Sequence, residues 1–140
     1  MGVVNEGLNY ILNAVFPVSP ANIWYVGLIN NSPTPTFAGT DSLAQVGGTN
    51  GWAELPYSTG YTGNRPLWTN GTASGQQITN SSYVSFAMLG TYTVYGIFLC
   101  TVASGVSGTM FGTAPLVGGT QAVVSGDTLQ ITITSVGASS

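Results

Sequence analysis

Short stretches of β-forming residues, separated by turns rich in glycine and asparagine, dominate this sequence. Thr128–Thr134 alternates cleanly between aliphatic and polar residues, and Tyr92–Cys100 is rich in β-formers on both faces. Gly96, inside the second stretch, suggests a bulge or a close backbone approach. Further strands are predicted over Ile23–Ile29, Ile78–Met88 and Thr109–Ala114. About six to eight short strands without a strand–helix–strand rhythm indicate an all-β fold. We predict a jelly-roll-like or Greek-key β-sandwich, with a small barrel as the alternative.

The one helical segment lies near the start of the chain. Four apolar residues recur there at the spacing of one helix face: Leu8, Ile11, Leu12 and Val15. Asn5 is a suitable N-cap, and Pro17 ends the run. A helix this short is marginal alone, so it has to pack on its own domain or on a neighbour. We therefore predict an N-terminal helix or arm over residues 1–17 and a single β-sandwich domain over residues 18–140.

A long stretch after the first strand carries most of the turn-forming residues. Residues 30–76 contain Ser-Pro, Thr-Pro, Gly-Gly and Asn-Gly pairs. A loop of this length without structure of its own is unusual in a compact domain. The stretch is therefore predicted to hold short strands over Trp52–Tyr57 and Pro66–Thr69, or to form an arm that becomes ordered on a partner.

Charged side chains are almost absent, and this narrows the possible functions. The sequence has one cation, Arg65, and four acids, Glu6, Asp41, Glu54 and Asp127, with no histidine. Charged residues make up 4% of the chain, against about 25% of an average soluble protein. A surface with so little charge lacks the like-charge repulsion that keeps free monomers apart. This composition favours a protein that is docked in an assembly.

The same composition argues against most chemistry. Acid–base catalysis at neutral pH usually needs histidine, and a guanidinium cannot act as the base for a serine nucleophile. Scattered acids predict no metal site, and a net charge of −3 opposes binding to nucleic acid. A glycosidase-like pairing of Glu54 with Asp127 stays open but is not favoured. We expect no enzyme activity, no catalytic residue, no metal and no cofactor.

The cysteine count and the apolar runs bear on the compartment. Cys100 is the single cysteine, so no intrachain disulfide can form. We expect Cys100 to be buried at the end of a strand, where it packs as a small hydrophobic residue. No apolar run is long enough to span a membrane, and the first residues do not resemble a signal peptide. We therefore expect a protein made in a cytoplasm, with no membrane partner.

Arg65 stands in the most unusual neighbourhood of the sequence. Two of the three tryptophans, Trp52 and Trp68, and the acid Glu54 lie within thirteen positions of it. An isolated charge in a nearly uncharged protein is seldom unpaired, so we predict a partly buried ion pair with Glu54 or Asp127, with a tryptophan stacked on the guanidinium. The favoured interpretation is an internal staple that fixes the long loop. The alternative is a subunit interface, where Trp, Tyr and Arg are common anchors.

The predicted strands also carry many aromatic residues. These are Trp24, Tyr25, Tyr83, Tyr92, Tyr95 and Phe98. Packing in the core and across strands is the favoured interpretation. The alternative is an exposed platform on which sugar rings stack.

Several short motifs together resemble small structural proteins of tailed double-stranded DNA phages, often identified as capsid decoration (cement) proteins. The likeness spans nearly the whole chain, although each motif is short. The motifs are Leu8-Asn9-Tyr10, Ile23-Trp24-Tyr25-Val26-Gly27-Leu28-Ile29, Gly51-Trp52-Ala53-Glu54, Arg65-Pro66-Leu67-Trp68, Ile78-Thr79-Asn80, Val94-Tyr95-Gly96-Ile97-Phe98-Leu99 and Val124-Ser125-Gly126-Asp127-Thr128-Leu129. The resemblance implies a jelly-roll-like protein on the capsid exterior that clamps neighbouring major capsid subunits after the shell expands.

The resemblance also implies partners and contact residues. The expected partners are the major capsid protein and further copies of the chain, with a trimer favoured over a dimer. We expect the helix and residues 31–66 to make the contacts. The candidate interface residues are Leu8, Ile11, Leu12, Val15, Phe16, Trp52, Glu54, Arg65 and Trp68. A tail-fibre or tail-tube component and a non-catalytic carbohydrate-binding module are the alternatives.

Overall fold

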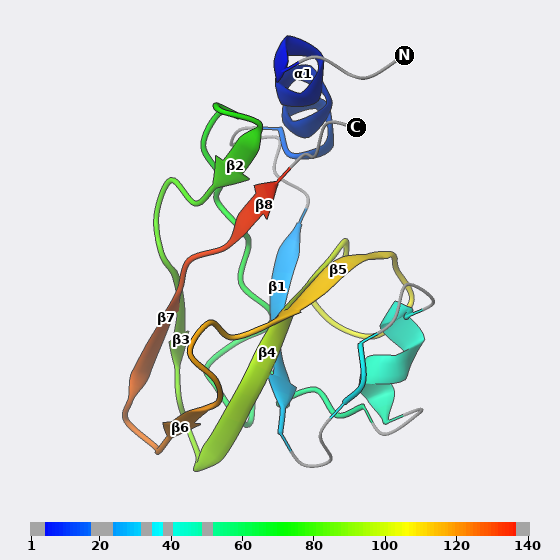
Figure 1. The fold of residues 1–140 in the computed structure, drawn as a ribbon. Helices are drawn as coiled ribbons and strands as arrows, with labels where there is room; N and C mark the ends of the chain where they lie inside the picture. The colour runs from blue at the N-terminus through cyan, green and yellow to red at the C-terminus, as the bar shows by residue number, and fades with distance from the viewer. Residues whose placement is uncertain (1–4, 18–23, 32–34, 38–40, 49–51, 137–140) are drawn as a thin grey trace.

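A computed structural model describes residues 5–17, 24–31, 35–37, 41–48 and 52–136. The fold is all-β with one short α-helix, as predicted (Figure 1). The elements are α1 (Asn5–Val15), β1 (Tyr25–Asn30), the 3₁₀-helix η1 (Leu43–Gly47), β2 (Gln77–Thr79), β3 (Val84–Ala87), β4 (Tyr92–Cys100), β5 (Met110–Pro115), β6 (Gln121–Val123), β7 (Thr128–Ile131) and β8 (Thr134–Val136). All strand pairs are antiparallel.

The long strand β4 is the centre of the larger sheet. It pairs with β1, and it also pairs with both β5 and β6. Gly96 lies opposite Pro115, whereas Val94, two residues earlier, lies opposite Gln121, six residues later. The register therefore contains four extra residues, and β5 and β6 are two parts of one partner strand interrupted by an excursion. Val117 in this excursion is fully exposed, at 106% of its reference area.

A two-stranded ribbon forms the second layer. β2 pairs with β8 and β3 pairs with β7, so the continuous strands expected over Ile78–Met88 and Thr128–Thr134 are each broken in the middle. Asn80 fills the break: its amide nitrogen donates to the Ile131 carbonyl at 2.8 Å, and its amide oxygen accepts from the Ile133 N–H at 2.9 Å. One side chain thus provides the hydrogen bonds that a partner strand would otherwise make to Ile131 and Ile133.

Between the sheet and the ribbon, one side is bridged by residues 53–71, which we call the closed seam. This segment follows the free edge of β1, where the Leu55 N–H donates to the Leu28 carbonyl. It also reaches the ribbon, where the Thr62 N–H donates to the Ala87 carbonyl at 2.9 Å. The strands predicted inside this stretch are therefore single β-bridges rather than regular strands, because the segment has to cross from one layer to the other.

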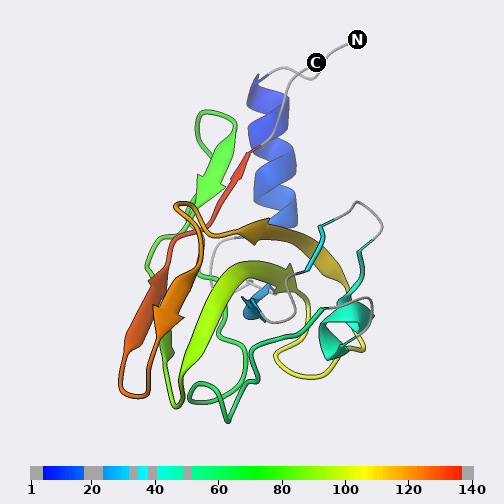
Figure 2. The same cartoon turned by 60° about the horizontal axis from the view of Figure 1, so that its bottom comes forward.

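On the opposite side, β5 and β6 face β7 and β8, and we call this gap the open seam (Figures 1 and 2). Within the described part of the chain, no backbone hydrogen bond joins β5 to β7 or β8. One end of the seam is closed by the turn between β6 and β7, where the Asp127 N–H donates to the Val124 carbonyl.

The core has two parts because the sheet is covered on both faces. The larger cluster lies between sheet and ribbon and includes Leu12, Phe16 and Trp68. The smaller cluster lies on the other face, under η1, and includes Trp52 and Phe98. Burial on both faces explains why β1 has apolar residues on both of its faces. The helix is attached through Phe16, which is completely buried, and through Asn9 and Asn13, whose amide oxygens accept from the Gln76 and Ala73 N–H groups at 3.0 and 2.8 Å.

Two glycines permit this close packing. A Cβ on Gly27 would lie 2.0 Å from the Phe98 ring, and one on Gly96 would lie 2.4 Å from the Ala114 carbonyl oxygen. The close backbone approach predicted at Gly96 is therefore confirmed. Gly27 is needed because Phe98 lies directly over β1.

Candidate functional site

The predicted ion pair is present between Arg65 and Glu54. The Arg65 Nε donates to Glu54 Oε1, and a terminal nitrogen donates to Oε2, both at 2.7 Å. The Arg65 side chain is completely buried and that of Glu54 is 9% exposed. This two-pronged geometry is the strongest form of such a pair, since both carboxylate oxygens are held by charge-assisted bonds.

Further contacts fix the guanidinium to the end of β4. Its other terminal nitrogen donates to the Val102 carbonyl at 3.1 Å and lies 3.8 Å from the Cys100 sulfur. The rings of Tyr57 and Phe98 each have their centroid 5.2 Å from the guanidinium carbon. The prediction of a stacked tryptophan is wrong: Trp52 and Trp68 pack in the two core clusters instead. Sequence reasoning missed Phe98 because β4 is far from Arg65 along the chain.

Backbone bonds connect the ion pair to three other segments. The Glu54 N–H donates to the Val46 carbonyl of η1 at 3.1 Å, and Glu54 forms a β-bridge with Ile29 of β1. The Arg65 N–H donates to the Ala103 carbonyl at 3.0 Å. The pair therefore holds two points of the closed seam to η1, to β1 and to the loop that follows β4, which is the geometry of an internal staple.

Burial and charge act in opposite directions on the two groups. Desolvation raises the pKa of Glu54, and the hydrogen bonds and charge of Arg65 only partly counteract it. The pKa of Arg65 is raised too, because the attraction of Glu54 outweighs the cost of burying the guanidinium. Burial also raises the pKa of the neighbouring Cys100 thiol. Such groups are structural: the carboxylate is engaged on both oxygens, and the thiol is shielded.

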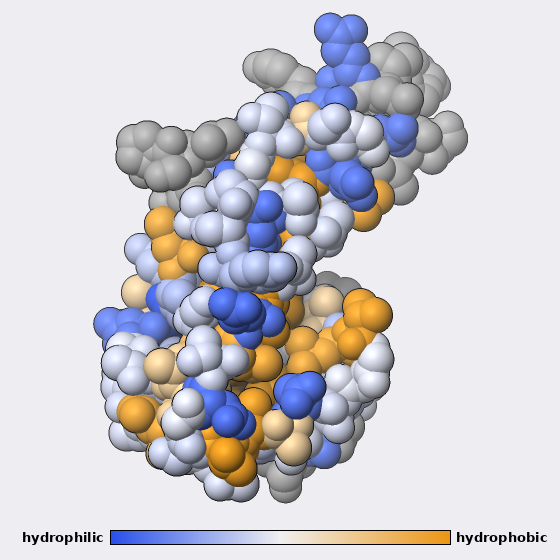
Figure 3. Space-filling view, turned by 90° about the vertical axis from the view of Figure 1, so that its left-hand side faces the viewer, coloured by the Kyte–Doolittle hydropathy of each residue, from blue (hydrophilic) through white to orange (hydrophobic). Residues whose placement is uncertain are grey.

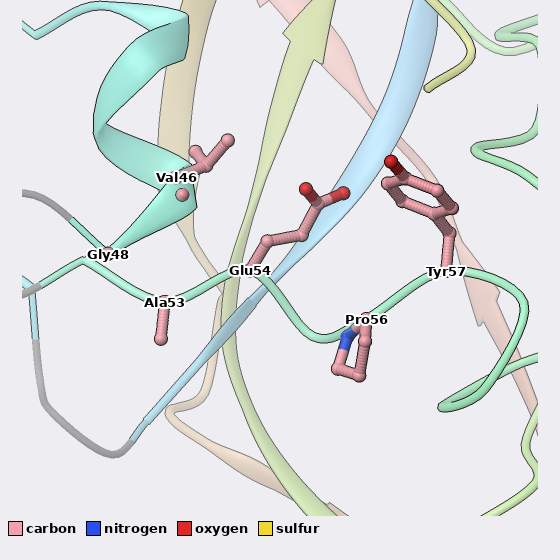
Figure 4. A pocket seen from close by; sticks show the side chains of 7 residues that line it. Val46, Gly48, Ala53, Glu54, Pro56 and Tyr57 are labelled. Atoms are coloured by element: carbon pink, nitrogen blue, oxygen red, sulfur yellow. The ribbon is translucent and has the colours of Figure 1, made fainter. Parts of the chain in front are cut away.

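An open pocket of about 380 Å³ borders the pair on the solvent side (Figure 4). The Glu54 carboxylate points between Val46 and the Tyr57 ring, whereas Ala53 and Pro56 point the other way. Two polar side chains of the pocket already have hydrogen-bond partners. The Glu54 carboxylate is bound by Arg65, and the Tyr57 hydroxyl accepts from the Gly105 N–H at 3.0 Å. The pocket therefore presents little free hydrogen-bonding capacity to a ligand.

The remaining candidate interface residues separate into buried and exposed groups. Leu12, Phe16, Trp52 and Trp68 are at most 7% exposed and belong to the core of the single chain. Val15 packs against the main cluster. Ile11 is 49% exposed on the helix surface. The Leu8 side chain lies outside the described residues.

Most aromatic residues of the strands pack internally, as predicted, but two are exposed. Tyr83 is 65% exposed and Phe111 is 45% exposed. Tyr83 borders a 270 Å³ pocket lined otherwise by hydroxyl and amide side chains. Phe111 contacts the edges of Phe16 and Trp24, with centroid distances of 4.7 and 5.2 Å.

Comparison with known protein families, with curated proteins and with solved structures found no match to this chain. Among the described residues, no helix has the length and apolar character needed to cross a membrane. No group of three or more His, Cys, Asp or Glu side chains that could hold a metal ion occurs in the same part of the chain.

Proposed function

We propose that this chain is a structural protein of a tailed-phage particle, which binds the outside of the capsid and clamps neighbouring major capsid subunits after expansion. The observation that carries the proposal is the position of the only cation. Arg65 is held in the interior by Glu54, so the four acids of the sequence leave three that are not in this pair. Apart from these three acids, the outer surface can contact partners only through uncharged polar and apolar groups, which suits a permanent assembly.

Rigidity supports the same proposal. The ion pair connects η1, the closed seam and β4, and the helix is anchored by a completely buried Phe16. A clamp between subunits transmits force only if its own parts do not move relative to one another. We propose that the jelly-roll-like connectivity and the trimeric state implied by the resemblance belong to this function.

The test is co-sedimentation with expanded and unexpanded capsid shells that lack the protein. Saturable binding to expanded shells alone is the expected result, and absence of binding to both would overturn the proposal. Removing residues 1–16 is unsuitable as a test, because it removes Leu12 and Phe16 from the core. Ile11→Ser is the better variant, and Leu89→Ser, at a residue of similar exposure, is its control. Weaker binding of the first variant alone would assign the contact to the helix.

Glycan binding is the second candidate, and Tyr83 is the observation that favours it. An exposed ring beside a pocket of hydroxyl and amide groups is an arrangement on which a sugar can stack. Tyr83→Ala should then abolish binding in a glycan array while leaving the thermal unfolding temperature unchanged. Absence of glycan binding by the wild-type protein would exclude this candidate.

A further inference from the structure

The open seam is an apolar groove between two unpaired strand edges. Three adjoining hollows of about 140, 250 and 270 Å³ follow it from end to end. Neighbouring hollows share lining residues: Ile97 and Ile133 belong to the first two, and Ile131 and Val117 to the last two. Figure 3 shows the ribbon side of the molecule, where apolar residues lie in a hollow with polar residues around it.

Both edges of the groove have backbone groups available for pairing. Among the residues that the structure describes, β5 pairs with β4 on one side only, and β7 and β8 pair only with β3 and β2. Natural proteins usually protect such edges with lysine, proline or a covering segment. Here β5 has only Pro115 at its end, and β7 and β8 contain no charged residue. These edges are therefore suited to accept a further strand.

The closed seam shows how this molecule fills the equivalent gap. In the closed seam, an irregular, extended segment donates a backbone hydrogen bond from Leu55 to Leu28 of the sheet. At the ribbon, its Thr62 N–H donates to the Ala87 carbonyl, and its Gly60 carbonyl accepts from the Leu89 N–H. Its buried side chains, Leu55, Tyr61 and Trp68, complete the core. An extended segment in the open seam would have the same two sets of backbone partners and would cover Ile97, Ile131 and Ile133.

The absence of charged side chains along the groove indicates which kind of segment could occupy it. No residue that lines the three hollows is charged, so a charged side chain on the occupant would be buried without a partner. A six-residue segment of an average protein carries about one or two charges. This chain, in contrast, has no charged residue between Arg65 and Asp127 or in residues 128–140. A second copy thus has the required chemistry along more than half of its length.

We propose that the open seam is a self-association site, in which an extended segment of a second copy adds as a strand between β5 and the ribbon. The contact joins two different surfaces of the chain, so its repetition gives a closed ring where the rotation between copies closes and an open filament where it does not; the proposal is the closed ring. The proposal does not depend on a capsid, because the association takes place between free copies.

The test is the mass of the purified full-length protein by sedimentation velocity across a wide concentration range. The wild type should form a discrete oligomer whose dissociation constant changes little with salt, since no charges are involved. Ala114→Lys on β5 and Thr132→Lys on the ribbon should each weaken association about tenfold or more. Ala87→Lys and Thr62→Lys, at exposed positions outside the groove, are the matched controls and should leave it unchanged.

Hydrogen exchange provides a second readout that does not depend on substitution. The amides of residues 112–115 and 130–134 should gain protection as the concentration rises, whereas those of exposed loops should not. A wild-type monomer at every concentration would overturn the proposal, as would an oligomer that the two groove lysines do not weaken. If a monomer lost shell binding through the groove lysines, the occupant would instead be a capsid subunit, and self-association would be excluded while the proposed function stood.

Discussion

The two seams of the molecule join the same layers by different means. In the closed seam, residues 53–71 bridge sheet and ribbon through backbone bonds, and Arg65 anchors them with two charge-assisted hydrogen bonds to Glu54. In the open seam, as far as the structure describes the chain, the layers meet only through side chains and the turn at its end. Among the described residues, the backbone bonds between the layers are therefore concentrated on one side of the molecule, and the strand edges on the other side have no backbone partner across the gap.

The largest effect is expected for the anchor of the closed seam. Arg65→Ala removes one partner of a buried pair and leaves the Glu54 carboxylate uncompensated, so the free energy of unfolding should fall by about 3–5 kcal/mol. Urea unfolding followed by tryptophan fluorescence measures it. Thr62→Ala, an exposed change in the same segment, should stay within about 0.5 kcal/mol. Similar values for both variants would show that the ion pair is not the anchor.

The next effect concerns the ribbon. Asn80→Ala removes the amide that serves the Ile131 carbonyl and the Ile133 N–H, and it also leaves the Trp68 indole N–H without this acceptor. Unsatisfied buried groups of this kind should cost about 1–3 kcal/mol. Ser81→Ala, which removes one exposed hydroxyl contact, is the control in the same unfolding experiment. Equal free energies of unfolding for the two variants would mean that the hydrogen bonds of Asn80 do not stabilise the ribbon where its strand pairing is interrupted.

A dependence on pH sharpens the role of the ion pair. Because the pKa of Glu54 is raised in the folded protein above its ordinary value, the folded state binds this proton more tightly than the unfolded state. Protonation of Glu54 therefore stabilises the folded state. This contribution to the free energy of unfolding is fully present below the pKa that Glu54 has in the unfolded chain, and it is lost as the pH rises through its pKa in the folded protein. The wild type should gain stability relative to Glu54→Gln when the pH is lowered from 7 to 4. If the free energy of unfolding of the wild type fell relative to that of Glu54→Gln as the pH was lowered, the raised pKa of Glu54 would be contradicted.

The smallest effect is expected in the open seam. Ala114→Lys changes an exposed residue on an unpaired edge, so the stability of the dissociated chain should change by no more than about 0.5 kcal/mol. The measurement is thermal unfolding at a concentration where the protein is monomeric, with Ala87→Lys as the control. A loss of several kcal/mol would show that this seam, too, carries part of the fold.

Local sequence patterns predicted much of the fold, since they depend on neighbouring residues. The helix ending before Pro17, the strand over Tyr92–Cys100 and the close approach at Gly96 all follow from spacing and residue type. The breaks in the ribbon were not predicted, because they depend on one side chain, Asn80, replacing backbone bonds between distant segments. β6 was also missed, because it is only three residues long.

The candidate site was predictable only in part. Scarcity of charge was enough to predict an ion pair of Arg65 with Glu54 or Asp127, and the structure shows Glu54 as the partner. It was not enough to predict which rings cover the guanidinium, since Phe98 reaches it only because Gly27 leaves room over β1. Tyr57, which is near Arg65 in the sequence, does cover the guanidinium. Trp52 and Trp68 pack in the two core clusters instead, since alternate residues along an extended segment point to opposite faces.

The buried thiol gives this protein a natural reporter of its own opening. Cys100 is inaccessible and lies against Arg65 and the Val102 carbonyl, and its raised pKa keeps it protonated. A thiol-specific reagent can therefore modify it only when β4 separates from the segment that covers it. The rate of labelling would report how often the molecule loosens at the ion pair, in a free copy and in an assembled one, without any added dye or engineered residue.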